Sequence, residues 1–237
     1  MTQILPAIYL AAGEGRRLRP LTDEQPKAML EIGGATLAER ALRALRGAGV
    51  ERVVAVTGHA REKLDEVDGL LSEQVFNPHF ADANNVYSLW CARDVVSGGC
   101  YIINSDVLFE RAIADRLVSA SGSAVLCASD HGADHESMKA VSRDGRLVQL
   151  SKAAPSEGNP EYIGLTRIDP SEGPPLVSIL ERIVADELTD VYYEDALNDL
   201  AAEAAVGIVP VDGLAWIEID DTDDLTRARG EILERVG

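Results

Sequence analysis

The chain is poor in cysteine and in positive charge, and each shortage excludes a class of function. Its three cysteines, Cys91, Cys100 and Cys127, lack C-x-x-C spacing, so the sequence indicates neither a disulfide framework nor a cysteine-based zinc site. Lysine and arginine number 22 against 40 acidic residues, which gives a formal net charge of -18. Such a charge repels nucleic acid and anionic membranes, so neither is an expected partner.

Long apolar runs are also missing. A membrane-spanning helix needs roughly 18 or more consecutive apolar residues, and the chain has no such stretch. The first residues lack the basic and apolar pattern of a secretory leader. We therefore expect a cytoplasmic protein. Its 237 residues suffice for a sizeable core, and we predict a single domain over residues 1–237.

Apolar and amphipathic segments alternate in the first third of the chain. Residues 4–10 and 52–57 have the continuous apolar pattern of buried strands, whereas 36–48 and 62–70 have a helical period. This β-α-β-α order predicts an α/β, Rossmann-like fold with ligands beyond the carboxyl ends of parallel strands. Further predicted elements are strands at 100–104, 122–129, 162–166 and 215–219, helices at 175–188 and from 222 onward, and an exposed loop at 153–159.

A glycine loop follows the first predicted strand. Residues 10–22 read L-A-A-G-E-G-R-R-L-R-P-L-T, and Pro26 and Lys27 follow. The loop is not a P-loop, which needs G-x-x-x-x-G-K-[ST], and Leu18 stands where a dinucleotide fingerprint needs a third glycine. Three arginines and Lys27 would repel one another unless an anion lies among them. The loop therefore predicts a polyphosphate site, with Gly13 and Gly15 letting backbone N–H groups approach the ligand.

Two acidic residues end predicted strands and are candidate metal ligands. Asp106 follows a buried strand, and Asp220 follows the alternating run W-I-E-I, in which Glu218 and Asp220 share a face. Mg²⁺ prefers oxygen ligands and commonly takes one or two carboxylates together with phosphate oxygens. We predict a magnesium site at Asp106 and Asp220. Asp221 and Thr222 are assigned instead to the start of the next helix.

The motifs together resemble one enzyme family. The pattern L-A-A-G-x-G-x-R-L-x-P-L-T-x-x-x-P-K is similar to that of nucleotidyltransferases, which join a nucleoside triphosphate to a phosphorylated small molecule. Further motifs narrow the resemblance to the cytidylyltransferases acting on phosphocholine and on small phosphonates. These motifs are Asn84-Asn85-x-Tyr87-Ser88-Leu89, Ser105-Asp106, Glu136-x-Met138-Lys139, Tyr193-Glu194-Asp195 and Trp216-x-Glu218-x-Asp220. The resemblance implies a GT-A-like fold with a mixed, mostly parallel sheet.

The resemblance also implies roles for single residues. Arg17 and Lys27 would bind and neutralise the triphosphate of CTP, and Asp106 and Asp220 would hold Mg²⁺. Together with the strand-end argument, it gives a nucleotide site formed by Leu10, Ala11, Ala12, Gly13, Gly15, Gly58, Asn85 and Ser88. Arg16 and Arg19 fall on variable motif positions and are expected at the rim.

The acceptor is less clearly indicated. Met138 and Glu194 stand where the phosphocholine enzymes are expected to have tryptophan, and Lys139 would repel a trimethylammonium group. These features favour a small phosphonate or phosphate monoester, while the nearby carboxylates favour an ammonium, so phosphocholine or phosphoethanolamine stays an alternative. A sugar-1-phosphate with another nucleotide is a further one, and a homodimer is left open. The predicted acceptor site is Glu136, Met138, Lys139, Lys152, Tyr193, Glu194, Asp195, Trp216 and Glu218.

Overall fold

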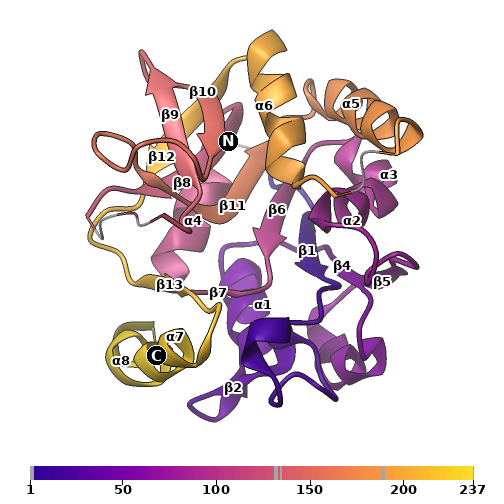
Figure 1. Cartoon of the computed structure of the whole chain (residues 1–237), viewed down its shortest axis with the longest axis vertical. Helices are drawn as coiled ribbons and strands as arrows, with labels where there is room; N and C mark the ends of the chain where they lie inside the picture. Colours follow the sequence, from indigo (N-terminus) through magenta and orange to yellow (C-terminus); the bar gives the residue numbers. More distant parts are fainter. Residues whose placement is uncertain (1–2, 131–132, 134, 188–189, 237) are drawn as a thin grey trace.

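A mixed sheet runs through the molecule (Figure 1). The computed structural model describes residues 3–130, 133, 135–187 and 190–236, and within them the main sheet has nine strands. In spatial order these are β5 (Glu73–Phe76), β4 (Val53–Thr57), β1 (Ala7–Ala11), β6 (Cys100–Asn104), β11 (Glu161–Ile168), β8 (Ser123–Ala128), β12 (Val206–Pro210), β10 (Arg146–Ser151) and β9 (Lys139–Arg143).

The direction of the strands divides the sheet into two halves. Strands β5, β4, β1 and β6 are parallel, so their carboxyl ends meet at one edge. Beyond β6 the sheet is mixed, because β11 runs antiparallel to both β6 and β8, while β12 is parallel to β8. The sequence predicted β4, β1 and β6 of the first half, together with β8 and β11. It did not predict β5, β9, β10 and β12. The last three lie at or near the other edge of the sheet, and each contains exposed residues.

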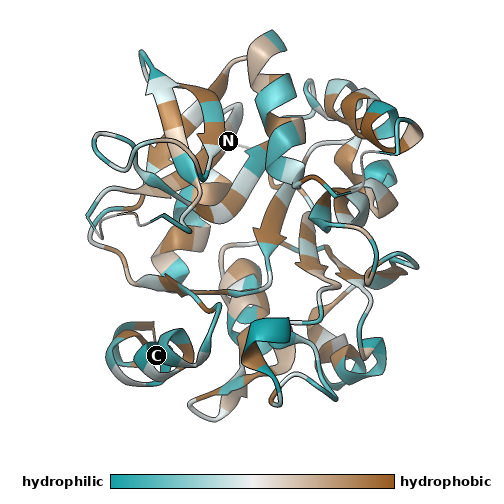
Figure 2. Cartoon of the chain, viewed as in Figure 1, coloured by the Kyte–Doolittle hydropathy of each residue, from teal (hydrophilic) through white to brown (hydrophobic). Residues whose placement is uncertain are grey.

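Helices cover both faces of the sheet. Helices α1 (Leu37–Gly47) and α4 (Arg111–Ser119) pack on one face. The other face carries α2 (Asn85–Cys91), α3 (Arg93–Val96), α5 (Gly173–Ala185) and α6 (Tyr193–Glu203). Ile8 and Leu10 of β1 point to this second face, and Tyr9 to the first. Because both faces are covered, β1 is apolar throughout, as Figure 2 shows for β1 and β6.

A third, smaller core lies beyond the carboxyl ends of the parallel strands. It joins the hairpin β2 (Glu31–Ile32) and β3 (Ala35–Thr36), the pair β7 (Val107–Phe109) and β13 (Trp216–Glu218), and α7 (Thr222–Arg227). A π-helical turn (Ala228–Ile232) and α8 (Leu233–Val236) continue α7. Short 3-10 helices, η1 (Arg16–Leu18) and η2 (Lys27–Met29), connect β1 to this core.

Most predicted helices form close to their expected positions. A capping box between Thr36 and Glu39 fixes the start of α1. The segment predicted as a helix at 62–70 is instead a 3-10 helix, η3 (Arg61–Leu70), with a non-helical backbone at Val67. Few of its residues are buried. Packing of an apolar face, which supplies most of the stability of an α-helix in a protein, is therefore small in this segment, and the short 3-10 turns remain. The expected end of α5 at Leu188 lies outside the described residues. In the described part of the chain, no helix is both long and apolar enough to cross a bilayer.

Gly164 of β11 allows a test of how closely β11 packs against Asn104 at the end of β6. Its φ is +76°, and an added Cβ would meet the Asn104 side chain at 2.8 to 3.0 Å. We expect Gly164→Ala to lower the free energy of unfolding by more than about 1 kcal/mol in chemical denaturation. Gly207→Ala in β12 is the matched control, because its Cβ would meet only ordinary contacts at 3.7 and 3.8 Å. Equal losses in both variants would contradict the close approach at Gly164.

Candidate active site

The pairing of β7 with β13 brings the two predicted metal ligands together. Asp106 immediately precedes β7, and Asp220 lies two positions after Glu218, the last residue of β13. The strands are antiparallel, with Val107 opposite Glu218, so Asp106 lies beside Glu218 and Asp220. The backbone N–H of Ile219 donates to the Asp106 carbonyl at 2.9 Å and fixes this alignment. Residues more than one hundred positions apart in the chain therefore converge at one edge of the sheet.

The first turn of α7 holds Asp220 in place. The Asp221 side chain accepts hydrogen bonds from the N–H groups of Asp223 and Asp224, so it caps the helix. Asp224 in turn accepts from the Asp220 N–H at 3.0 Å. The structure thus gives Asp221 the capping position expected from the sequence, and leaves the Asp220 side chain to face the glycine loop.

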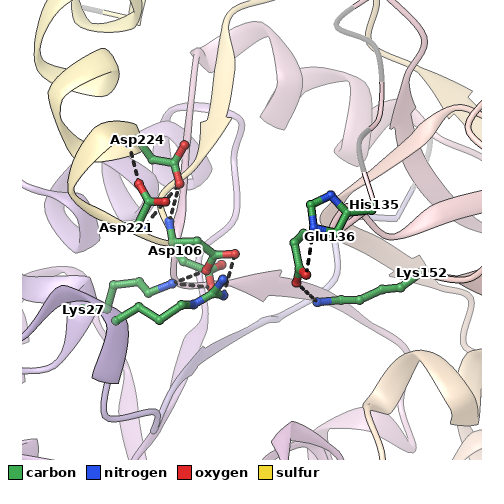
Figure 3. A network of polar contacts seen from close by, with 9 residues as sticks. Lys27, Asp106, His135, Glu136, Lys152, Asp221 and Asp224 are labelled. Carbon is green, nitrogen blue, oxygen red and sulfur yellow. Dashed lines mark hydrogen bonds and ion pairs between the residues drawn. The ribbon is translucent and has the colours of Figure 1, made fainter.

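Two cations of the glycine-loop segment contact these acids (Figure 3). Lys27 donates to Asp106 Oδ2 at 3.2 Å and to Asp220 Oδ1 at 2.9 Å. A guanidinium nitrogen of Arg17 lies 2.8 Å from Asp220 Oδ2. Arg16 and Arg19 do not join this group but pair with Glu14, at 2.7 and 3.2 Å. Only one side of the loop therefore faces the acids, as expected from the sequence.

Burial and charge set the ionisation of this group. Burial would lower the pKa of Lys27, but the carboxylates of Asp106 and Asp220 outweigh it and raise that pKa. Burial would likewise raise the pKa of Asp220, but Lys27 and Arg17 hold it below its ordinary value. Burial, together with the charges of Asp106 and Asp220, raises the pKa of Glu218 well above the usual range for a carboxyl group. Lys27 and Asp220 are therefore charged at neutral pH.

The donor set fits a hard divalent cation. Three carboxylate oxygens, one each from Asp106, Glu218 and Asp220, lie within 4.8 Å of one another. Asp106 Oδ1 is buried and accepts no hydrogen bond from any described residue. A buried carboxylate oxygen of this kind needs a partner, and carboxylate oxygens are the ligands that Mg²⁺ favours. The geometry supports these three residues as candidate ligands, Glu218 being an addition to the predicted pair.

The glycine loop has the close contacts that its sequence requires. Gly15 has φ +61°, and an added Cβ would meet Thr22 at 3.1 Å and Lys27 at 3.4 Å. The Thr22 hydroxyl donates to the Gly15 carbonyl at 2.8 Å, which closes the loop on itself. Gly58 has a related role at the end of β4, because its Cβ would come within 2.6 Å of the Ala12 carbonyl. Gly58 therefore makes room for the loop.

A cavity of about 530 Å³ opens between the glycine loop, α2, β6, β11 and the start of α6. It joins the predicted nucleotide, triphosphate, metal and acceptor residues in one continuous space. The predicted residues that line it are Leu10, Ala11, Ala12, Gly13, Gly15, Arg17, Lys27, Asn85, Ser88, Asp106, Glu136, Met138, Lys152, Glu194, Glu218 and Asp220.

Five predicted residues do not line this cavity. Lys139 is only 1 % exposed in β9, and Gly58 lies behind the glycine loop. Tyr193 is buried below the cavity, and Asp195 accepts from the Tyr192 N–H and caps α6. Trp216 lines a neighbouring hollow of about 260 Å³ that shares Glu218 and Asp220 with the main cavity. A direct acceptor contact by any of them stays a prediction.

A buried hydrogen-bond chain forms the floor of the cavity. The Tyr193 hydroxyl donates to Asn104 Oδ1 at 3.0 Å and lies 2.6 Å from the Tyr162 hydroxyl, which in turn lies 2.7 Å from Thr166 Oγ1. Asn85 Oδ1 accepts from the Tyr193 N–H at 2.8 Å, so it ties α2 to α6. Sequence reasoning did not single out Tyr162 or assign Asn104 to the site. The polar end of β6 was the available signal for Asn104, whereas Tyr162 depends on the register of β11.

Glu194 lies above this floor in the first turn of α6. It is 5 % exposed, and the Asn85 side chain hydrogen-bonds to it. Its Oε2 atom has no hydrogen-bond partner among the described residues. Burial raises the pKa of Glu194 to about 7. The cavity therefore contains a buried carboxylate with one oxygen available to a ligand.

The opposite rim of the cavity carries charge of both signs. Figure 3 shows Glu136 and Lys152 facing each other, across the cavity from Lys27 and Asp106. Lys152 Nζ lies 3.8 Å from Glu136 Oε2 and 5.5 Å from the centre of the Tyr192 ring. Tyr192 lines the cavity, although the sequence pattern pointed to its neighbour Tyr193. Helix phase explains the difference, because Tyr192 precedes α6 and Tyr193 is its first, inward residue.

A parallel half-sheet with a glycine loop, cations and paired acids at its carboxyl edge defines the nucleotidyltransferase class. The chain belongs to the family of MobA-like NTP transferase domains, whose model matches residues 7–206.

Individual relatives agree with this assignment. The chain is 29% identical over 229 residues to the bifunctional IPC transferase and DIPP synthase of Aquifex aeolicus, covering 94% of this chain but only 50% of that protein. It is 26% identical to the choline-phosphate cytidylyltransferase of Streptococcus pneumoniae, covering 97% and 99% of the two chains. The solved structure of the pneumococcal enzyme superposes with a TM-score of 0.85, at 25% identity over 98% of this chain and 100% of that chain. The 2-aminoethylphosphonate cytidylyltransferase of Lancefieldella rimae is 26% identical, over 92% of this chain and 89% of the relative.

The raised pKa of Glu194 predicts a pH-dependent stability. The folded state holds the proton more tightly than the unfolded state, so Glu194 weakens the fold progressively as pH rises from its ordinary pKa of 4.5 to about 7. Glu194→Gln should therefore be more stable than the wild type above about pH 7, by on the order of 2 kcal/mol, with a smaller difference near pH 5. Denaturant unfolding in metal-free buffer at both pH values measures this difference.

Glu136→Gln is the control for that experiment, because the Glu136 side chain is 57% exposed. Its effect on stability should be small and similar at both pH values. A pH-independent effect of Glu194→Gln would show that the Glu194 carboxyl is not perturbed by burial.

Proposed function

We propose that this protein transfers a cytidylyl group from CTP to a small phosphonate or phosphate monoester and releases pyrophosphate. The observation that carries the proposal is the convergence of Lys27, Asp106 and Asp220 at the mouth of the glycine loop. The relatives support the choice of nucleotide and acceptor class, since their names include choline-phosphate and aminoethylphosphonate cytidylyltransferases. The chain spans half of the Aquifex relative, so only that half is comparable.

The triphosphate would lie along the glycine loop. Backbone N–H groups near Gly13 and Gly15 would face its oxygens, and Arg17 and Lys27 would neutralise its charge. Cytidine would lie at the end of the cavity that is lined by Leu10 to Ala12 and, on the other side, by Asn85 and Ser88. Both Asn85 oxygen and amide are engaged with α6. We therefore assign Asn85 the role of shaping the cytidine pocket.

The reaction needs positioning and charge neutralisation more than proton transfer. An oxygen of the acceptor's phosphonate or phosphate attacks the α-phosphorus of CTP in line, the bond to the bridging oxygen breaks, and pyrophosphate leaves with the electron pair. The attacking oxygen is already anionic near pH 7, so no general base is required. The barrier comes from repulsion between two anions and from charge that grows on the leaving group. Lys27 and Arg17 lie where they offset both.

We also propose that the enzyme depends on Mg²⁺. Asp106 and Asp220, with Glu218 beside them, would hold the ion, which would supply further charge neutralisation and orient the phosphate oxygens. The net charge of -18 supports small phosphates, and not nucleic acid, as partners, since a small anion needs only the local basic loop. We further propose a cytoplasmic location and a single domain.

The acceptor would bind between Lys152 and Glu194. Lys152 at the rim can pair with the phosphonate or phosphate, and Glu194 can receive an ammonium at the other end. Met138 lines the cavity where the phosphocholine enzymes are expected to have tryptophan, so that wall lacks an aromatic face for a quaternary ammonium, while Phe80, Tyr162 and Tyr192 line other parts of the cavity. Lys139 is buried, so the repulsion it was expected to exert on choline is not supported. The case against choline therefore rests on Met138 and Glu194.

Substitutions in the charged cluster test the catalytic assignment. Asp106→Asn and Asp220→Asn should each remove most turnover while circular dichroism shows a retained fold. Lys27→Ala and Arg17→Ala should lower kcat by about 10²- to 10³-fold, by analogy with the loss of one oxyanion donor. Arg16→Ala is the control, because Arg16 pairs with Glu14 outside the cluster. Comparable losses at Arg16, Arg17 and Lys27 would contradict the one-sided loop.

Pyrophosphate release with four nucleotides and a panel of acceptors tests the substrate. We expect CTP to be preferred, and 2-aminoethylphosphonate to exceed phosphocholine in kcat/KM by about tenfold or more, since each missing aromatic face costs a quaternary ammonium about 0.5 to 2 kcal/mol. Phosphoethanolamine, hydroxymethylphosphonate and a sugar-1-phosphate complete the panel. A kcat/KM for phosphocholine above that for every phosphonate would overturn the acceptor assignment, but the assignment as a cytidylyltransferase would stand. Activity confined to sugar-1-phosphates would overturn both.

A further inference from the structure

The carboxylates that would hold the metal are engaged by the protein's own cations. Asp220 offers two oxygens, and each has a cation: Lys27 lies 2.9 Å from Oδ1, and Arg17 lies 2.8 Å from Oδ2. Asp106 Oδ2 is also 3.2 Å from Lys27. Among the four carboxylate oxygens of Asp106 and Asp220, Asp106 Oδ1 is the one without a hydrogen-bond partner among the described residues. The Lys27 ammonium thus bridges the same two side chains that the divalent ion needs.

A divalent ion and this ammonium oppose each other. Mg²⁺ binds a carboxylate oxygen at about 2.1 Å, so an ion on Asp106 and Asp220 would lie within a few ångströms of a cation that contacts both. The Lys27 side chain is 13% exposed, so water screens this repulsion weakly. Metal binding to the free protein is therefore opposed for as long as Lys27 stays in place.

The triphosphate changes this balance. Lys27 begins a 3-10 helix on the edge of the cavity, and both Lys27 and Arg17 line the space beside Gly13 and Gly15. Phosphate oxygens in this space offer the two cations new partners. If the Lys27 ammonium moves onto a phosphate oxygen, oxygens of Asp106 and Asp220 become available to the metal. The negative charge of the triphosphate attracts the metal further.

Resting on the proposed function, we infer that Lys27 competes with the divalent cation for Asp106 and Asp220, and that CTP relieves this competition. Lys27 thereby couples the two ligands: the free protein binds the metal weakly, and metal and nucleotide bind strongly only together. By linkage, the metal raises the affinity for CTP by the same factor as CTP raises the affinity for the metal.

Mn²⁺ binding to the nucleotide-free protein, measured by electron paramagnetic resonance, tests the competition. Lys27→Met keeps an unbranched side chain, one atom shorter than lysine, and removes the charge. It should bind Mn²⁺ about tenfold or more tightly than the wild type, although it loses a phosphate ligand. Arg16→Met is the matched control, because it removes a charge from the same loop without touching Asp220, and it should bind Mn²⁺ as the wild type does. In the double variant Lys27→Met, Asp220→Asn the gain should disappear.

A second measurement tests the coupling. Calorimetric titration of CTP in EDTA and in Mn²⁺, corrected for the Mn²⁺·CTP complex that forms in solution, gives the factor by which the two ligands reinforce each other. That factor should be smaller in Lys27→Met than in the wild type, by about fivefold or more. If Lys27→Met does not fold, Lys27→Gln, which keeps a hydrogen-bond donor for one carboxylate, replaces it in both measurements.

The outcomes separate this inference from the proposed function. Unchanged or weaker Mn²⁺ binding in a folded Lys27→Met, an equal gain in Arg16→Met, or a gain that survives Asp220→Asn would each overturn the competition. The proposed function would still stand if the wild type released pyrophosphate from CTP. Tight Mn²⁺ binding in Lys27→Met, joined to a wild type without cytidylyltransferase activity, would support the competition and reject the function.

Discussion

The ammonium of Lys27, held between Asp106 and Asp220, is the interaction on which the rest of the site depends. It joins the end of the glycine-loop segment, the end of β6 and the end of β13. The carboxylates of Asp106 and Asp220, which each place an oxygen within 4.8 Å of the other, would repel each other strongly without it. The same ammonium lies at the edge of the cavity proposed to hold the triphosphate. One charged group therefore stabilises the acidic cluster and, in the proposed function, would place a cation beside the substrate.

The fold produces this arrangement from two simple features. Parallel strands end at one edge of the sheet, which places the glycine loop beside Asp106. The antiparallel pairing of β7 and β13 then adds residues from the C-terminal part of the chain to the same edge. The acceptor half of the cavity comes from the mixed half of the sheet and from α6. The residues proposed for the nucleotide and for the acceptor thus come mainly from different halves of the sheet, and the hydrogen bonds of Asn85 to α6 connect the two.

Local signals in the sequence located the carboxyl edge of the parallel strands well. Continuous apolar runs located β1, β4 and β6, and the polar residues that follow them marked the ligand side, including Asp106. The acceptor side was harder, because strand register and helix phase decide which residues face the cavity. Tyr192 lines the cavity where Tyr193 was chosen, and Lys139 lies in the core although its charge pointed to a ligand. Tyr162 was missed because β11 bulges between Tyr162 and Thr166, which no local pattern reveals.

A crystal structure of the protein with CTP and Mn²⁺, with the ion located by its anomalous scattering, tests the role of this charged cluster most directly. We expect the ion at about 2.2 Å from oxygens of Asp106 and Asp220, the triphosphate along the glycine loop, and the Lys27 ammonium on a phosphate oxygen. An ion held away from both aspartates would contradict the assigned site. A Lys27 that still bridged Asp106 and Asp220 with nucleotide bound would contradict the competition between its ammonium and the metal.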